Sequence, residues 1–288
     1  MRARRLRGWL GLTALLCLSG CSMTQLAYNR LDLIVRWEVS DYLRLDPVQQ
    51  ARFDSDFATL WAWHREKELP LYAEELRSLA AALERPQTRA ELEALLLRAR
   101  ARQAQVLERA ADIACALGPQ LDEAQVTELL STMAEAREDY AQTAVEPSEA
   151  RQRRDHEREL LQQLRRWLGD ITTAQHDLIM RWSAERPLVN APWLEAQRQF
   201  GDAVAAALEV RQQPDFCMRI RPLIVDRSQL WPPDLRAVFA ANQAQWLNLT
   251  EALQPSLTAP QRRHLHERLL ELAEDFEALA ADSSLPRE

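Results

Sequence analysis

The sequence predicts an all-α protein of two tandem, repeated multi-helix halves, which form a helical bundle or a short superhelical array. Ala, Leu, Arg, Glu and Gln dominate the composition, which is typical of helices. Only three of the six glycines lie after residue 20, too few for the turns of an extended sheet protein. A ten-residue box occurs twice, at 116–125 and at 252–261. The composition predicts the helices, and the box predicts the repeat.

The repeated box reads Ala-Leu-x-Pro-x-Leu-[Asp/Thr]-x-x-Gln, and its second half recurs at 45–49 and 171–175. Asp or Thr at an N-cap accepts a backbone N–H of the first helical turn, and Gln three residues later reaches back to the cap. We therefore expect four N-caps, at Asp46, Asp122, Thr172 and Thr258. Further short segments repeat in the same order, so Asp46 should match Thr172 and Asp122 should match Thr258.

The first 20 residues indicate where the protein works. Four arginines within residues 2–7 precede a short apolar run, 9–18, that is too short to be a lasting transmembrane helix. The following Leu18-Ser19-Gly20-Cys21 resembles the lipobox of bacterial lipoprotein signal peptides. This resemblance implies removal of residues 1–20 and acylation of Cys21, which would anchor the chain permanently. Ser22 after the cysteine implies the periplasmic face of the outer membrane.

The charge balance limits the partners. Removal of residues 1–20 takes away four arginines and no acidic residue, so the net charge changes from −7 to −11. Nucleic-acid binding depends on basic contacts to phosphates, and this balance argues against it. The expected partners are the membrane, through the acyl chains on Cys21, and an envelope protein or peptide. The oligomeric state stays open.

The chain divides at points where its composition changes. The divisions are a signal peptide (1–20), a lipidated tether (21–24), a first helical half (25–145), a charged linker (146–158), a second helical half (159–282) and a tail (283–288). The linker is nearly free of apolar residues and contains Pro147. A basic patch for lipid head groups is one interpretation of it, but its mixed charges favour a solvated helix. The first helix is expected at 25–44, with its apolar stripe at Leu31, Ile34, Val35, Val39 and Tyr42.

Several motifs together suggest a family. They are Tyr28-Asn29-x-Leu31-Asp32, Leu45-Asp46-Pro47-x-Gln49, Trp63-His64-Arg65-x-x-x-Leu69-Pro70, Arg166-Trp167-Leu168-Gly169-x-Ile171-Thr172 and Leu257-Thr258-x-x-Gln261. Over nearly the whole chain they resemble a family of uncharacterised proteobacterial lipoproteins, and no activity comes with the resemblance. The Leu-Thr-x-x-Gln boxes also resemble those of the small periplasmic chaperones Spy and CpxP. That likeness suggests a chaperone-like behaviour.

The sequence offers few candidates for chemistry. Trp61 and Trp63 are candidates for aromatic contact with a ligand, although their helical spacing is more typical of core residues. His64 and Glu68 would need a third ligand from elsewhere to bind zinc, and we expect no metal and no cofactor. No phosphate-binding glycine loop, Gly-x-Ser-x-Gly or His-Glu-x-x-His motif is present. These absences lower the odds of an enzyme.

Two cysteines are left for a disulfide. Processing would remove Cys17 and acylation would occupy Cys21, which leaves Cys115 and Cys217 in an oxidising compartment. A bridge between them would connect the two halves. The alternative, two buried unpaired thiols, stays open because the segment around Cys217 has no counterpart in the first half.

The function that these patterns favour is a membrane-anchored, non-enzymatic protein that binds or scaffolds an envelope protein or peptide. An exposed apolar patch in the concavity between the halves would serve such binding. One alternative is a hydrolase or carbohydrate-active enzyme with two carboxylates in the cleft between the halves. Another is a lipid or lipopolysaccharide carrier, which requires an apolar cavity.

Overall fold

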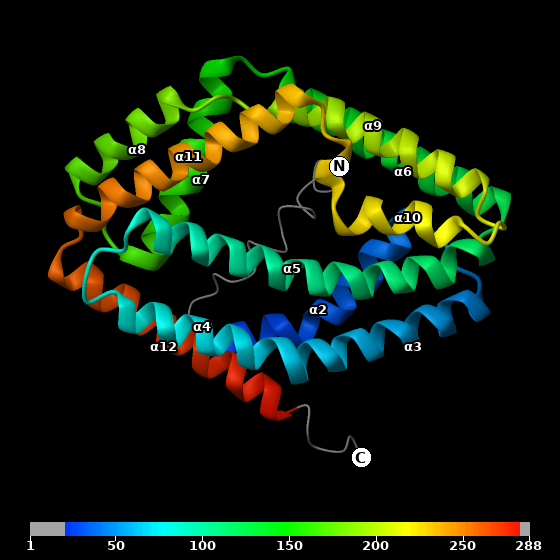
Figure 1. Cartoon of the computed structure of the whole chain (residues 1–288), viewed down its shortest axis with the longest axis horizontal. Coiled ribbons are helices and arrows are strands. Elements are labelled where there is room, and N and C mark those ends of the chain that lie inside the picture. Colours follow the sequence, from blue (N-terminus) through cyan, green and yellow to red (C-terminus); the bar gives the residue numbers. More distant parts are fainter. Residues whose placement is uncertain (1–20, 283–288) are drawn as a thin grey trace.

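The computed structural model describes residues 21–282, which form eleven α-helices and no strand (Figure 1). The helices are α2 (Cys21–Tyr42), α3 (Pro47–Trp63), α4 (Leu69–Ala82), α5 (Arg89–Leu117), α6 (Glu123–Tyr140), α7 (Glu149–Leu168), α8 (Thr173–Glu185), α9 (Asn190–Glu209), α10 (Phe216–Val225), α11 (Pro233–Ser256) and α12 (Ala259–Asp282). Short turns join some of them: η3 (His64–Glu68), η4 (Gly118–Gln120), η5 (Ala141–Val145) and η6 (Arg227–Leu230). The all-α prediction is confirmed. The signal peptide and the tail predicted at 1–20 and 283–288 lie outside the described residues.

The four boxes stand at helix starts. Asp46, Asp122 and Thr172 are the N-caps of α3, α6 and α8, and each forms a reciprocal capping box with the Gln three residues later. At the start of α12, the Gln261 N–H donates to Thr258 Oγ1, and the Thr258 N–H donates to the Gln261 side chain. Local hydrogen bonds therefore decide where these four helices begin.

The boxes are also joined in pairs by their buried glutamines. Gln49 and Gln125 donate to each other's side-chain oxygen over 3.0 and 2.6 Å, and Gln175 and Gln261 do the same over 2.8 and 2.9 Å. Each amide also donates to the carbonyl two residues before its partner's cap. Gln49 donates to the Gln120 carbonyl and Gln125 to the Arg44 carbonyl. In the second pair, Gln175 donates to the Ser256 carbonyl and Gln261 to the Asp170 carbonyl. Both pairs thus follow one pattern, while the superposition of the complete halves stays a prediction.

The two sequence halves interlock. α12, from the second half, lies along α4 and α2 of the first, and α6 of the first half lies along α9 of the second (Figure 1). Two of the three core clusters in the described residues are shared between the halves, and the third, around Ile179, Leu249 and Leu253, lies within the second half. One combines Leu43, Leu117, Leu121 and Val126 with Val204, Leu208, Phe216 and Ile220; another combines Tyr28, Leu69 and Ala73 with Leu272, Phe276 and Leu279. Neither half therefore completes its apolar core alone.

Most of the predicted linker 146–158 is helical. Residues 149–158 form the first part of α7, and only 146–148 lie between helices. Ion pairs at helical spacing join Arg153 to Glu149 and join Asp155 to both Arg151 and Arg158. Such pairs support an exposed helix, which agrees with the solvated-helix interpretation of this segment.

The segment without a counterpart in the first half forms α10 and η6, and α10 is fastened to the end of α5. Cys115 and Cys217 are joined by a disulfide with a Cα–Cα distance of 4.9 Å, so the bridge connects the two halves. One turn later, Arg221 pairs with Glu108 and Asp112 of α5. The disulfide and the ion pairs together fix α10 against the C-terminal part of α5.

Candidate functional site

A π-helical turn interrupts the long rod formed by α3 and α4. The Leu69 N–H bonds to the His64 carbonyl five residues before it, and Pro70 follows directly. Proline has no N–H for the Glu66 carbonyl, and its ring would clash with that carbonyl in a regular helix. The sequence predicts a kink or restart at Pro70, and the structure has a widened turn there. Such turns are frequent at functional sites, which makes their side chains candidates.

The turn places His64 in an aromatic cluster. The Tyr28 hydroxyl lies 2.7 Å from His64 Nδ1, the Tyr28 ring stacks on Trp61 at 4.6 Å, and Tyr72 meets His64 edge-on. Burial lowers the pKa of His64 to about 4 and raises the pKa of Tyr28 well above its usual value. His64 is therefore neutral at physiological pH, and its Nδ1 is hydrogen-bonded to the Tyr28 hydroxyl.

Two buried charges complete the cluster. Arg65 Nε donates to the Leu279 carbonyl of α12 over 3.1 Å, and Glu68 lies 3.9 Å from Arg102 of α5. Burial raises the pKa of Tyr72 to about 12, and the neighbouring Glu68 carboxylate adds to the effect. These contacts join η3 to α5 and α12, and the Arg65 bond to α12 connects the two halves.

The predicted aromatic contacts have partners inside the protein. Trp61 stacks on Tyr28 and Phe57, and the Arg109 guanidinium lies 4.1 Å from the centre of the Trp63 ring. Both tryptophans are partly buried. The described residues hold no group of three His, Cys, Asp or Glu side chains that could bind a metal ion. The π-turn cluster is therefore a structural contact between helices.

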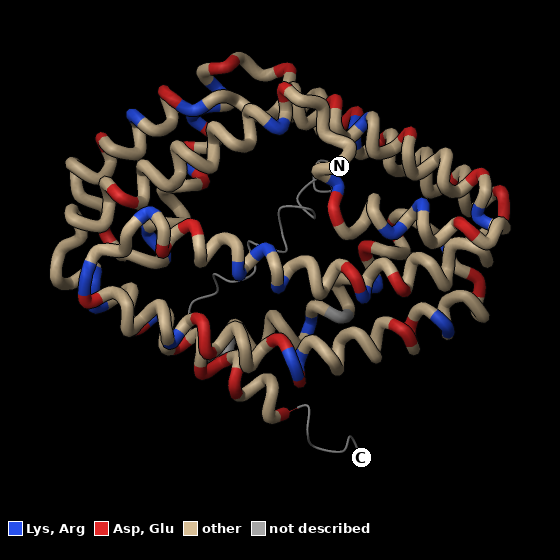
Figure 2. Tube along the Cα trace, in the orientation of Figure 1, with Lys and Arg blue, Asp and Glu red and all other residues tan. Residues whose placement is uncertain are grey.

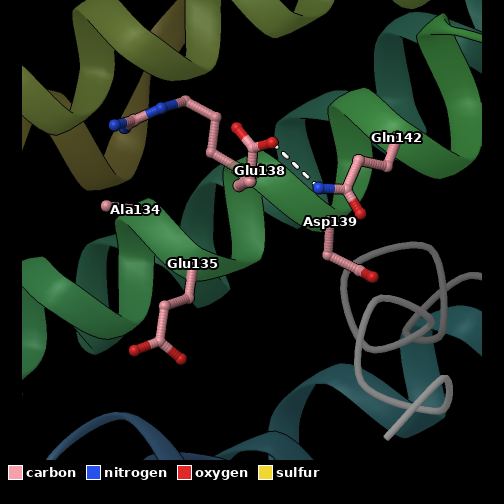
Figure 3. A pocket seen from close by; sticks show the side chains of 6 residues that line it. Ala134, Glu135, Glu138, Asp139 and Gln142 are labelled. Atoms are coloured by element: carbon pink, nitrogen blue, oxygen red, sulfur yellow. Dashed lines mark hydrogen bonds between the residues drawn. The ribbon is translucent and has the colours of Figure 1, made fainter.

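A depression of about 560 Å³ on α6 is a second candidate. Ala134, Glu135, Arg137, Glu138, Asp139 and Gln142 line it. Figure 3 shows Glu135 and Glu138 pointing to opposite sides of the helix, and Gln142 donates to Glu138 over 2.9 Å. An acid pair for hydrolysis needs two carboxylates that face one reacting atom. Glu135 and Glu138 do not face one atom, whereas Glu135 and Asp139 are one turn apart and point to the same side of the helix (Figure 3).

Exposed apolar side chains are the third candidate. On α5, residues 97–101 are all exposed, more than one full turn, so every side of this segment is at least partly open to solvent. Leu97 is 64% exposed, and Trp246 on α11 is 39% exposed. Arg100 of α5 donates to Gln243 of α11 over 2.5 Å, within one turn of both apolar residues. We call Leu97, Arg100, Gln243 and Trp246 the α5–α11 surface.

The charges distinguish the middle of α5 from other segments. Arg98, Arg100 and Arg102 follow one another on alternate positions, and Figure 2 shows basic residues gathered in the middle of this helix. Arg98 pairs with Glu75 of α4 over 2.9 Å, and Arg102 lies 3.9 Å from Glu68. Arg100 is therefore the cation that lies beside the apolar side chains of the α5–α11 surface.

A second group of exposed apolar residues lies on α2: Leu26, Leu33, Ile34 and Trp37. The expected stripe of this helix placed Ile34 with the core residues, and this is wrong, because Ile34 is 42% exposed. Among the described side chains of α2, the buried ones are Thr24 and Tyr28. Cys21 is the first residue of α2, but its side chain lies outside the described part. No helix between residues 21 and 282 is long and apolar enough to cross a membrane.

The fold and the surface define an all-α protein with interlocked halves, stabilised internally by paired capping boxes and carrying exposed apolar faces. The pattern of a family of unknown function, DUF6279, matches residues 41–236. The match covers more than half of the chain, and the chain belongs to this family. No curated protein and no solved structure shows significant similarity to it.

Proposed function

We propose that the chain is a lipid-anchored protein of the cell envelope that binds a protein or peptide partner through its α5–α11 surface, without catalysis. The exposed turn 97–101 of α5 is the observation that carries the proposal. Leaving Leu97 in water forgoes the free energy that burial of its side chain would give, and a partner that covers it recovers this energy.

The chemistry of the surface indicates the kind of partner. Leu97 and Trp246 suit apolar side chains, and a Trp ring gives a large rigid contact area. Arg100 is one turn from Leu97 and bonds to Gln243, which is one turn from Trp246, and its guanidinium suits a carboxylate. The expected partner is therefore a segment with apolar residues flanked by acidic ones. A polymer of phosphates is disfavoured, because the net charge of −7 repels it at long range.

The lipobox ending in Cys21 supports the anchoring part of the proposal. An acylated Cys21 at the first position of α2 would hold the body close to the membrane, at the periplasmic face of the outer membrane. Fatty-acid labelling in cells tests this part. Label should enter the wild-type chain and be lost from Cys21→Ser; equal labelling of both chains would contradict acylation at this residue.

Crosslinking in living cells tests the binding part. A photoreactive amino acid at position 97 should give a discrete crosslinked product, and mass spectrometry of that product names the partner. Position 218 is the matched control, because Met218 is 73% exposed on α10 and lies outside the α5–α11 surface. Products of the same size and yield from both positions would indicate nonspecific collision and would contradict the proposal.

The two alternatives have their own signatures. A hydrolase would turn over a small substrate in a way that depends on a carboxylate pair, and Glu135 and Asp139, on one side of the helix at the depression, are the pair whose substitution would test it. A lipid carrier would release bound lipid on denaturation of the purified protein. Detection of turnover or of stoichiometric lipid would replace protein binding as the function.

A further inference from the structure

The exposed face of α2 differs in composition from the remainder of an acidic protein. Among the described side chains of this helix, the exposed ones are Leu26, Asn29, Arg30, Leu33, Ile34, Trp37 and Ser40. None of these is acidic, and four are large and apolar. The apolar side chains are 42–58% exposed. This face therefore lacks a covering helix, and none of its described, fully exposed side chains is acidic.

The spacing puts the apolar residues on one side of the helix. Leu26, Leu33 and Trp37 recur at intervals of seven and four, and Ile34 is next to Leu33. The opposite side faces the protein: Tyr28 is buried in a core, Leu31 packs against the same core, and Val35 and Val39 are partly buried. α2 is thus an amphipathic helix whose inner face packs on the protein and whose outer face is apolar.

The position of Cys21 decides how this outer face meets a membrane. Trp37 is 16 residues from Cys21, or roughly 24 Å along the helix at 1.5 Å per residue. If α2 stood upright on an anchored Cys21, Trp37 would lie far above the lipid head groups. If α2 lies flat, all four apolar side chains reach the boundary between head groups and acyl chains. Interfacial amphipathic helices bury their apolar face to a depth of roughly 5–10 Å there.

The charges agree with the flat orientation. Arg30 is exposed on the outer face and suits anionic head groups, whereas Arg36 is turned toward the protein, where it pairs with Asp54 and lies over the Phe57 ring. Two carboxylates of α2 have described side chains, Glu38 and Asp41; both are partly buried and lie near the C-terminal end of the helix. An anionic membrane therefore meets less negative charge on the face that carries Leu26, Arg30 and Leu33 than on the acidic remainder of the surface.

We propose that α2 lies in the plane of the membrane surface, with Leu26, Leu33, Ile34 and Trp37 inserted among the lipid head groups. The proposal rests on the proposed acylation of Cys21. We choose lipid as the occupant because the anchor and the apolar face belong to one helix, which acylation places at the bilayer before any protein partner is bound. The orientation leaves the α5–α11 surface available to a partner.

Spin labels at two positions test the orientation. Leu33→Cys and Leu97→Cys are made in the full, processed chain and placed in vesicles of phosphatidylethanolamine and phosphatidylglycerol. Both native side chains are more than half exposed, so neither label disturbs a core. Cys115 and Cys217 are bonded to each other, and acylation occupies Cys21, so the introduced thiol is the one that reacts. The measurement is the accessibility of each label to oxygen and to a water-soluble nickel chelate.

The ratio of oxygen to nickel accessibility should be several-fold higher at position 33 than at position 97. Equal ratios on a chain whose acyl chains are shown by mass spectrometry would overturn the orientation and leave the anchoring intact. A chain without acyl chains would overturn both proposals, and the mass alone reveals it. A label at 33 that is shielded from both reagents and coupled to a second label would show a second copy on this face, which also overturns the lipid assignment.

Discussion

The side-chain amides of Gln49 and Gln125 donate to each other across the junction of α3 and α6, over 3.0 and 2.6 Å. Each amide oxygen also accepts the N–H of its own cap residue, Asp46 or Asp122. One buried pair of side chains thereby caps two helices and bonds them together. The pair Gln175 and Gln261 repeats the arrangement at the start of α8 and α12.

Removing one amide of a pair should cost more than one hydrogen bond. In Gln49→Leu, the Gln125 amide and the Gln120 carbonyl lose a buried partner, and unfolding should become easier by about 2–3 kcal/mol. Urea denaturation measures the change. Gln50→Leu is the control, because the Gln50 side chain donates to Asp54 one turn away on the same helix, and its loss should change stability by less than about 0.5 kcal/mol.

The double variant Gln49→Leu/Gln125→Leu extends this test. Residues that share a hydrogen-bond network are coupled, so the cost of the double change should be about 1 kcal/mol or more below the summed single costs. Additive costs would show that the two amides act independently and would contradict the network. The same cycle on Gln175 and Gln261 should give a coupling of similar size if the halves are equivalent.

Reduction of the disulfide should destabilise the fold. The bridge closes a loop with a sequence separation of 102 residues, for which chain entropy predicts roughly 4–5 kcal/mol. Denaturation of the wild type with and without a reductant measures the loss. Cys115→Ala/Cys217→Ala should be less stable than the oxidised wild type and insensitive to the reductant. An unchanged midpoint after complete reduction would contradict this prediction.

Gly118 should not tolerate a side chain. A Cβ at this position would overlap the Phe216 ring, which is buried on α10. Gly118→Ala should therefore cost about 1–3 kcal/mol through overpacking. Phe216→Leu in the same chain makes room and should recover part of the loss, although it lowers the stability of the wild type. If Phe216→Leu lowers the stability of the Gly118→Ala chain by as much as it lowers that of the wild type, the two changes act independently and the steric explanation is wrong.

Stability should fall as the pH falls from 6.5 to about 4. The folded pKa of His64 is about 4 and its ordinary value is 6.5, so in this interval the unfolded chain binds a proton that the folded chain does not. The loss from this residue should approach about 3 kcal/mol below pH 4. Burial and the neighbouring Arg186 lower the pKa of His156 to about 4 as well, and it adds to the same trend.

His64→Gln separates the two histidines. The amide can replace the imidazole as a partner of the Tyr28 hydroxyl but does not titrate, so this variant should lose clearly less stability than the wild type between pH 7 and pH 4. Unfolding free energies at the two pH values measure the difference. Identical pH dependence of variant and wild type would exclude His64 as a contributor.

The sequence predicts the helices and their starts well because these depend on local interactions. Asp46 and Gln49 are three residues apart, and their reciprocal bonds require no other part of the chain. The pairing of Gln49 with Gln125 depends on packing between residues 76 apart, and no local pattern contains it. The interlocking of α12 with α4 was missed for the same reason.

The sequence predicts that an exposed apolar surface exists, but it does not predict which helices carry it. An exposed apolar patch was expected between the halves, but interlocking removes a simple boundary between them, and the exposed residues lie on α2, α5 and α11. On α2, Leu26, Leu33 and Trp37 share one helical face, a signal that the sequence contains. A second apolar stripe on the same helix, which includes Val35 and Val39, competes with it. Hydrophobic periodicity cannot decide which of two stripes faces the core.

The central claim is that the α5–α11 surface binds a protein partner. It is tested most directly by the dissociation constant of the crosslinked partner for wild type, Leu97→Asp/Trp246→Ala and the control Met218→Asp, each with unchanged helical content. Loss of two exposed apolar contacts at the interface should weaken binding at least about tenfold, which corresponds to roughly 1.4 kcal/mol, while the control binds as the wild type does. Equal affinity of the double variant and the wild type would contradict the account.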